Sequence, residues 1–235
     1  NNMKDGRWIK NWDKLALSPE RIAAMRIAES GLDAIGTEHV ILRSVRLEGD
    51  ILFVQNQSFD LTKYKRIKVI GFGKASCDAA EVLEKVLGNK IKEGVVIGLH
   101  KKTCEFIQTY EGTHPRPSPE NMEVGKKIKE LATGAAEDDL YIVMVSGGGS
   151  ALLCYPEAEC EQGRLLYDAS VRSGISIGEL NTVRKHISGL KGGGLAKMLY
   201  PATVVSLIFS DVPGDNFADV ASGPTWPYLP LKYSS

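Results

Sequence analysis

The sequence carries no net charge, no long apolar run and few cysteine or histidine residues. Its 235 residues include 29 Lys and Arg against 29 Asp and Glu, and the pI is about 7.1. This balance removes the usual electrostatic signature of a protein that binds nucleic acid or an acidic membrane. No window approaches the roughly 18 consecutive apolar residues of a membrane-spanning helix, and the first residues contain no apolar signal-peptide core. We therefore expect a cytoplasmic protein whose partner is a small molecule, with no nucleic acid and no membrane.

Cysteine and histidine are also sparse. The four cysteines, Cys77, Cys104, Cys154 and Cys160, form no CxxC pair, and only four histidines are available to complete a zinc site. Because cysteine is among the most buried residue types, we expect reduced, mostly buried thiols. With 43% hydrophobic and 25% charged residues, the composition is that of an ordinary globular protein, which at this length needs no disulfide or metal to fold.

Hydrophobic periodicity predicts an α/β fold. Apolar segments typical of strands cover residues 67–72, 94–99, 140–145 and 203–209, and amphipathic segments typical of helices cover 75–87, 118–131, 160–173, 178–188 and 193–199. This alternation predicts a mostly parallel, Rossmann-like sheet with helices on both faces. Upstream, a helix begins after Ser18, and residues 39–47 and 51–55 are typical of a β-hairpin. We predict a single α/β domain over residues 1–235, with the N-terminal helix and β-hairpin attached.

Glycine gathers in loops that follow the predicted strands, where an open parallel sheet binds its ligands. The three groups are Ser146-Gly147-Gly148-Gly149-Ser150 after a strand, Lys191-Gly192-Gly193-Gly194 at a helix start, and Gly214 with Gly223 after the last strand. Glycine runs with free N–H groups at helix N-termini cradle anions, because side chains are absent and the helix dipole favours negative charge. Each run alone could be only a tight turn. Three runs at strand ends favour an anion site.

Cationic side chains accompany these glycines. Lys74 follows the first parallel strand at the start of a helix, where a cation opposes the helix dipole unless it meets a bound anion. Asn181, Arg184 and Lys185 lie within or near one helical turn, and Lys191 follows them. Such groups suit the neutralisation of a polyphosphate, whose transfer depends mostly on positioning and charge compensation. The alternative is a solvated lysine and a solvated basic helix face.

Two familiar phosphate motifs are incomplete. Lys74 is followed by Ala75, so the Walker pattern lacks its Ser or Thr, and the upstream glycine of that pattern is missing as well. The dinucleotide pattern GxGxxG has Ser76 in place of its third glycine, and the second strand ends near His100 without the acid that binds a ribose hydroxyl. These departures disfavour a nicotinamide-dependent dehydrogenase.

Carboxylates follow the last predicted strand. Asp211 and Asp215 flank a Pro-Gly turn, and Asp219 comes next. Carboxylates at a strand end beside a phosphate site suit a Mg²⁺ ion or the proton of a substrate hydroxyl. Aspartate is also a common turn former, which is the competing explanation.

Several long motifs resemble those of a known family. In chain order they are GKAS, SGGGSALL, LNTVRKHISGLKGGGLA and SDVPGDNFADVASGPT, and THPRPS resembles a histidine-proline loop of the same family. Together they resemble the type II glycerate kinases, whose second half is the MOFRL domain, over residues 19–227. The resemblance implies phosphorylation of D-glycerate, usually at its 2-hydroxyl, with ATP and Mg²⁺, in a cleft between a Rossmann-like domain and the MOFRL domain.

The resemblance also implies roles for individual residues. Lys74 corresponds to the lysine of the GKA motif, and the SGGGS loop and the glycine run after Lys191 correspond to anion-binding loops. Our hypothesis is that Lys74 and Arg184 neutralise the transferring phosphoryl group, while Asp211 or Asp215 binds Mg²⁺ or accepts the hydroxyl proton.

The sequence departs from the family pattern at two places. Phe72 stands where a small residue is usual, and Tyr228 stands where an acid is usual; the pattern ends there. We therefore expect the MOFRL domain to be absent from this chain and the chain to be short for full catalysis. The sequence also allows a homodimer.

Three other functions stay open. An acyl hydrolase would use Ser150 as its nucleophile, although the GxSxG pattern is absent. A hydroxypyruvate reductase would need a nicotinamide cofactor, against which the missing ribose acid argues. A non-catalytic nucleotide- or anion-binding fragment would use the same loops without chemistry.

Overall fold

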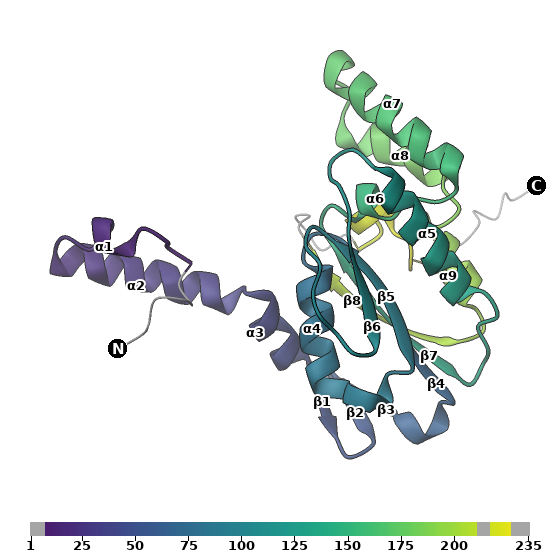
Figure 1. Cartoon of the computed structure of the whole chain (residues 1–235), viewed down its shortest axis with the longest axis horizontal. Helices are drawn as coiled ribbons and strands as arrows, with labels where there is room; N and C mark the ends of the chain where they lie inside the picture. Colours follow the sequence, from purple (N-terminus) through teal and green to yellow (C-terminus); the bar gives the residue numbers. More distant parts are fainter. Residues whose placement is uncertain (1–7, 211–216, 227–235) are drawn as a thin grey trace, which may run out of the picture.

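The computed structural model describes residues 8–210 and 217–226, and its centre is a parallel sheet (Figure 1). The sheet contains β4 (Arg66–Phe72), β5 (Glu93–Gly98), β6 (Ile107–Glu111), β7 (Asp139–Ser146) and β8 (Thr203–Phe209). These five strands are all parallel, in the order β6-β5-β4-β7-β8. This is the Rossmann strand order, which reverses between β4 and β7. The predicted fold class is confirmed.

Helices cover both faces of this sheet. On one face, α4 (Ser76–Leu87) packs with α3 (Thr37–Ser44) in a core that includes Leu83 and Met144. On the other face, α5 (Pro119–Ala132), the short α6 (Gly149–Leu152) and α9 (Gly194–Leu199) enclose a second core that includes Phe72 and Val143. Every residue of β7 is buried, as expected for a central strand covered on both sides.

The N-terminal region differs from its prediction. It contains α1 (Trp12–Leu15), α2 (Pro19–Ala34), α3, and an antiparallel sheet of β1 (Val45–Glu48), β2 (Ile51–Val54) and β3 (Gln57–Asp60). Ser18 caps α2 as predicted, but the stretch predicted as the first hairpin strand is helical up to Ser44. Its apolar residues also fit a helix face, with Ile41 buried against the domain. The predicted hairpin therefore starts later and gains a third strand.

A helical hairpin of α7 (Glu157–Ser173) and α8 (Ile177–Ile187) stands beyond the sheet, at the top of Figure 1. The predicted capping box is confirmed at α8. Ser176 Oγ accepts a hydrogen bond from the Glu179 amide, and the Glu179 carboxylate accepts one from the Ser176 amide. Three single-turn 3-10 helices complete the described structure: η1 (Leu61–Lys63), η2 (Gly88–Lys90) and η3 (Val220–Ser222).

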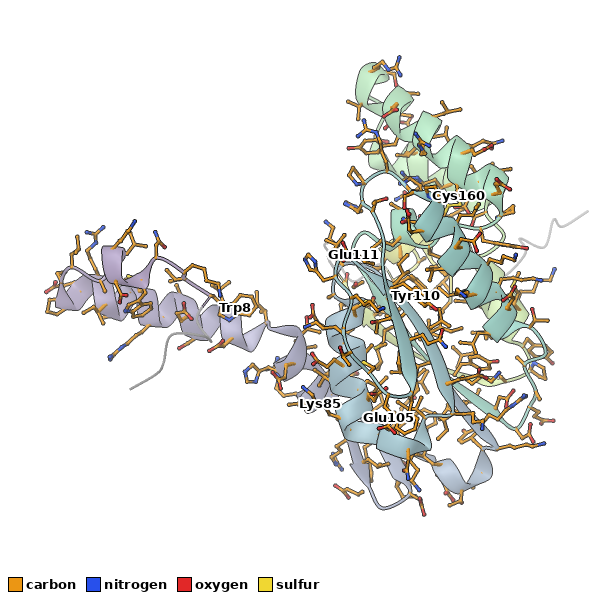
Figure 2. All side chains as sticks on the ribbon, in the orientation of Figure 1. Trp8, Lys85, Glu105, Tyr110, Glu111 and Cys160 are labelled. Atoms are coloured by element: carbon orange, nitrogen blue, oxygen red, sulfur yellow. A yellow bond between two sulfur atoms is a disulfide. The ribbon has the colours of Figure 1, made fainter. Side chains whose placement is uncertain are left out.

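The expectation of reduced thiols is wrong for two of the four cysteines. Cys154 and Cys160 form a disulfide, with their Cα atoms 5.4 Å apart, a separation that a disulfide accepts. Figure 2 shows Cys160 where α7 meets the domain. Cys77 and Cys104 are free, and burial raises their thiol pKa values to about 12 and about 11. Over the part of the chain that the structure describes, no helix is long and apolar enough to cross a membrane.

Candidate functional site

A pocket of about 410 Å³ lies at the carboxyl ends of the parallel strands. Its lining comprises Lys74, His114, Pro115, Gly148, Ser150, Ala151, Tyr167, Asn181, Arg184, Asp219 and Ala221. These residues come from the segments after β4, β6, β7 and β8 and from the α7–α8 hairpin. Figure 2 marks this end of the sheet with Glu111, the last residue of β6. The pocket therefore occupies the position where the strand order reverses and where ligands of such sheets bind.

A larger pocket of about 540 Å³ beside β8 offers less chemistry. It is lined by apolar and neutral polar residues of α3, β8 and the turn between β2 and β3, with Phe217. None of the described residues that line it has an ionisable side chain. The pocket at the strand ends is the candidate site, because its ionisable side chains meet at the edge of the sheet where such folds bind ligands.

Two loops meet at the base of this site. The Lys74 amide donates a hydrogen bond to the Gly147 carbonyl over 2.9 Å, and the Ala75 amide donates one to Ser146 Oγ over 3.1 Å. Gly148 has a positive φ of 81°, and a Cβ there would lie only 3.0 Å from both the Lys74 and His114 side chains. Glycine at this position therefore lets these two side chains close over the loop.

The loop after β7 also contacts η3. Ser150 Oγ lies 2.7 Å from Ser222 Oγ, and a Cβ at Gly149 would lie 2.5 Å from the Cβ of Ala221. Ala221 and Ser222 have positive φ values of 52° and 63°, which non-glycine residues seldom adopt. Such backbone strain concentrates at functional sites, where the surrounding structure holds it in place.

The helix α8 supplies cations to the opposite wall. Arg184 is only 7% exposed, and its Nη1 donates to Asn181 Oδ1 over 3.4 Å. Burial lowers the pKa of this guanidinium, whereas the negative charge of Glu159 raises it. Among the described residues, no carboxylate forms an ion pair with Arg184. Lys185 does not line the pocket, but its Nζ donates to Asp219 Oδ1 over 3.0 Å.

The structure gives Lys191 and its glycine run a different place from the one predicted. Lys191 is 2% exposed, and its ammonium donates to the Glu159 carboxylate and to the Leu153 carbonyl instead of lining the pocket. The Gly192 and Gly193 amides donate to the carbonyls of Ser222 and Gly223, each over 2.9 Å. These N–H groups are already paired, so they hold the strained loop at η3 rather than present themselves to an anion.

The predicted acidic pair, Asp211 and Asp215, lies outside the described residues. Asp219, the next carboxylate along the chain, lines the pocket. Within residues 8–210 and 217–226, no cluster of three His, Cys, Asp or Glu side chains is arranged to hold a metal ion.

Five residues of this pocket were not among the predicted site residues: His114, Pro115, Ala151, Tyr167 and Ala221. Tyr167 belongs to a largely polar helix, and nothing in its local pattern distinguishes it. Ala221 lies within the SDVPGDNFADVASGPT motif, but the positive φ of 52° with which it lines the pocket cannot be predicted from that motif. The THPRPS segment did carry a signal for His114, but only through its resemblance to a family loop.

Comparison with known proteins shows the family to which the domain belongs. Residues 23–230 match a family model described as "Domain of unknown function (DUF4147)". The chain belongs to this family. DUF4147 is the N-terminal domain of the MOFRL-type glycerate kinases, so the family predicted from the motifs is confirmed.

Relatives of this DUF4147 domain include enzymes with two different names. A glycerate 2-kinase of Pyrococcus horikoshii is 37% identical over 86% of the chain and 47% of the relative. A putative hydroxypyruvate reductase of Agrobacterium vitis is 41% identical over 68% of the chain and 43% of the relative. The crystal structure of a Thermotoga maritima glycerate kinase superimposes with a TM-score of 0.74 at 32% identity, covering 89% of this chain and 49% of that one. The chain thus spans about half the length of these relatives.

Proposed function

We propose that this domain phosphorylates D-glycerate at its 2-hydroxyl, with ATP as the phosphoryl donor. The observation that carries the proposal is the placement of Arg184, buried and without a carboxylate partner among the described residues, in one pocket with Lys74. Two cations around a glycine loop suit a substrate and a co-substrate that are both anionic. The kinase names of the relatives from Pyrococcus and Thermotoga support the same chemistry.

Different residues of the pocket have different roles in the proposed reaction. The 2-hydroxyl oxygen forms a bond to the γ-phosphorus, the bond from that phosphorus to the leaving ADP oxygen breaks, and a base takes the hydroxyl proton. Lys74 and Arg184 neutralise the charge of the transferring phosphoryl group. Ser150 and Asn181 hydrogen-bond the anionic groups of glycerate and ATP. The glycine loop from Ser146 to Ser150 lets these anionic groups approach the backbone.

The acidic residues after β8 supply the remaining functions of the proposal. One of Asp211 and Asp215 accepts the hydroxyl proton. Either could instead hold Mg²⁺, which would neutralise phosphate charge, since carboxylate oxygens are ligands that this ion prefers. Asp219 is engaged by Lys185 and so orients that cation beside the pocket. A cytoplasmic location and a homodimer stay predictions.

The test of this function is turnover of D-glycerate and ATP, followed as release of ADP, with and without a supplied MOFRL domain. Lys74→Met should lower kcat/KM by about 100-fold or more, because a lost transition-state donor typically has an effect of this size. Lys197→Met, which changes an exposed lysine of α9, is the matched control and should behave like the wild type. Unchanged turnover of Lys74→Met would contradict the role of Lys74, and 3-phosphoglycerate as the product would contradict the choice of hydroxyl.

A second candidate is the reduction of hydroxypyruvate, favoured by the name of the relative from Agrobacterium vitis. The loop after β5 reads Leu99-His100 and offers no acid for the ribose of a nicotinamide cofactor. Oxidation of NADH in the presence of hydroxypyruvate separates the two candidates, because the kinase does not consume NADH.

A further inference from the structure

A buried network of polar groups joins the two ends of the α7–α8 hairpin. The Glu159 carboxylate, in the first turn of α7, accepts hydrogen bonds from the Tyr155 amide and from Ser188 Oγ, each over 2.9 Å. It also accepts one from the Lys191 ammonium. Glu159 is 4% exposed, so all these interactions form away from solvent. Three donors satisfy a buried carboxylate that would otherwise be strongly destabilising.

The segment after α8 takes part in the same network. Ser188, which follows the last residue of α8, accepts hydrogen bonds from the Lys191 amide over 3.0 Å and from the Leu190 amide over 3.2 Å. The Gly189 amide donates to the Tyr155 carbonyl over 3.0 Å. The chain entering α7 and the chain leaving α8 are therefore fastened to each other at one place, centred on Glu159.

Outside this network, two ion pairs also link the hairpin to the rest of the domain: Arg116 pairs with Asp168 of α7 over 2.6 Å, and Lys185 of α8 pairs with Asp219 over 3.0 Å. All four of these side chains are much more exposed than Glu159 and Lys191, so these pairs are expected to contribute less to the orientation of the hairpin. Leu165, Val171 and Val183 are exposed, and three of the four buried residues that define the packing of α7 lie in its first half. Figure 1 shows the hairpin standing beyond the sheet. Arg184 lies four residues before Ser188, about one helical turn from the network.

We propose that Glu159 and Lys191 are positioning residues that hold Arg184 in its place in the pocket. The inference rests on the proposed function for its kinetic consequence but not for its geometry. Lys191 acts through Glu159 and touches neither substrate. Its charge is used inside the protein, where removing one partner leaves the other as an uncompensated buried charge.

A double-variant cycle tests the proposal with Lys191→Met, Glu159→Gln and the two combined. Lys191→Met should lower kcat by about 10-fold or more, since small misplacements of a catalytic group have large effects, while KM for ATP changes much less. The combined variant should regain most of the lost kcat, because it buries no unpaired charge. If Lys191 instead contacted phosphate, the combined variant would stay as slow as Lys191→Met, and the proposal would fail.

A second measurement reads the position of Arg184 without turnover. The Nε–H resonance of Arg184, assigned by its loss in Arg184→Lys, should shift in Lys191→Met and return towards its wild-type position in the combined variant. An unchanged resonance in Lys191→Met would overturn the proposal. If the wild-type protein does not phosphorylate glycerate even with a supplied MOFRL domain, the proposed function fails and this resonance alone decides the positioning role.

Two controls keep the outcome interpretable. Lys68→Met changes another buried lysine, which pairs with Glu93 over 3.0 Å away from the pocket, and it should leave both kcat and the Arg184 resonance unchanged. If Lys191→Met does not fold, Glu159→Gln carries the test, because its amide keeps the size of the carboxylate and should produce the same fall in kcat and shift in resonance. Wild-type values of both quantities in folded Glu159→Gln would contradict the proposal.

Discussion

Gly125 lies on the face of α5 that contacts the loop before α7, and its replacement by alanine offers a sharp test of the packing. A Cβ at Gly125 would lie 2.8 Å from the carbonyl carbon of Cys154 and closer still to the carbonyl oxygen. Ordinary contacts to a Cβ begin at about 3.4 Å, so either α5 or the backbone at Cys154 must move. Both belong to the buried core, which resists such movement.

The expected magnitude follows from two opposing effects. Alanine favours a helix over glycine by about 1 kcal/mol. Overpacking a close-packed core costs about 1–3 kcal/mol, and a clash with backbone lies at or beyond the upper end of that range. We therefore expect Gly125→Ala to lower the free energy of unfolding by about 2 kcal/mol, which for a domain of this size lowers Tm by about 4–8 °C.

Gly163 provides the matched control, because it is also a buried helical glycine. A Cβ at Gly163 would meet only Pro117 Cγ, at an ordinary distance of 3.5 Å. Gly163→Ala should therefore gain the helix preference of about 0.5–1 kcal/mol without a clash. Urea unfolding followed by circular dichroism measures both variants. Equal or higher stability of Gly125→Ala relative to the wild type would refute the steric reasoning.

Two further predictions concern titratable groups. Asp139 is buried and accepts two hydrogen bonds from Arg66; burial raises the pKa of this carboxyl, but these bonds bring it below its ordinary value of 3.8. Asp139→Asn should therefore reduce the unfolding free energy at pH 7 by about 2 kcal/mol. This difference should shrink below about pH 4, because the wild type then loses the ionised pair, and urea unfolding across pH measures it. Cys77, whose pKa burial raises to about 12, should react with a thiol reagent at pH 8 only as fast as the protein opens, and rapid labelling without opening would contradict that burial.

Four of the five strands of the central sheet could be predicted from the sequence, because buried parallel strands are continuous apolar runs that stand out from their surroundings. The strand 203–209 has its predicted bounds, and 67–72 and 140–145 each lengthen by one or two residues. β6 was not predicted, since its five residues, Ile107–Glu111, include polar side chains and pair with only one neighbour at the sheet edge. The short α3 was predicted as a strand because its apolar residues fit either period.

The ends of strands can also be predicted from the sequence, and for this reason several residues of the pocket were predicted. Lys74, Gly148 and Ser150 follow predicted strands, and parallel strands bring their carboxyl ends to one edge. Asn181 and Arg184 were found through their motif. The direction in which each side chain points could not be predicted from the sequence, because it depends on packing between elements that are distant along the chain.

Lys191 shows this limit most clearly. Its motif, a lysine before three glycines, suits a phosphate ligand, and the sequence contains no sign that Glu159, 32 residues earlier, would take its ammonium. Only the tertiary structure brings the base of α7 against the chain leaving α8 and removes both charges from solvent. Opposite charges attract each other more strongly in the low-dielectric interior of a protein than in water. The contact with Glu159 therefore keeps the Lys191 ammonium out of the pocket, whereas Lys74 and Arg184 line it.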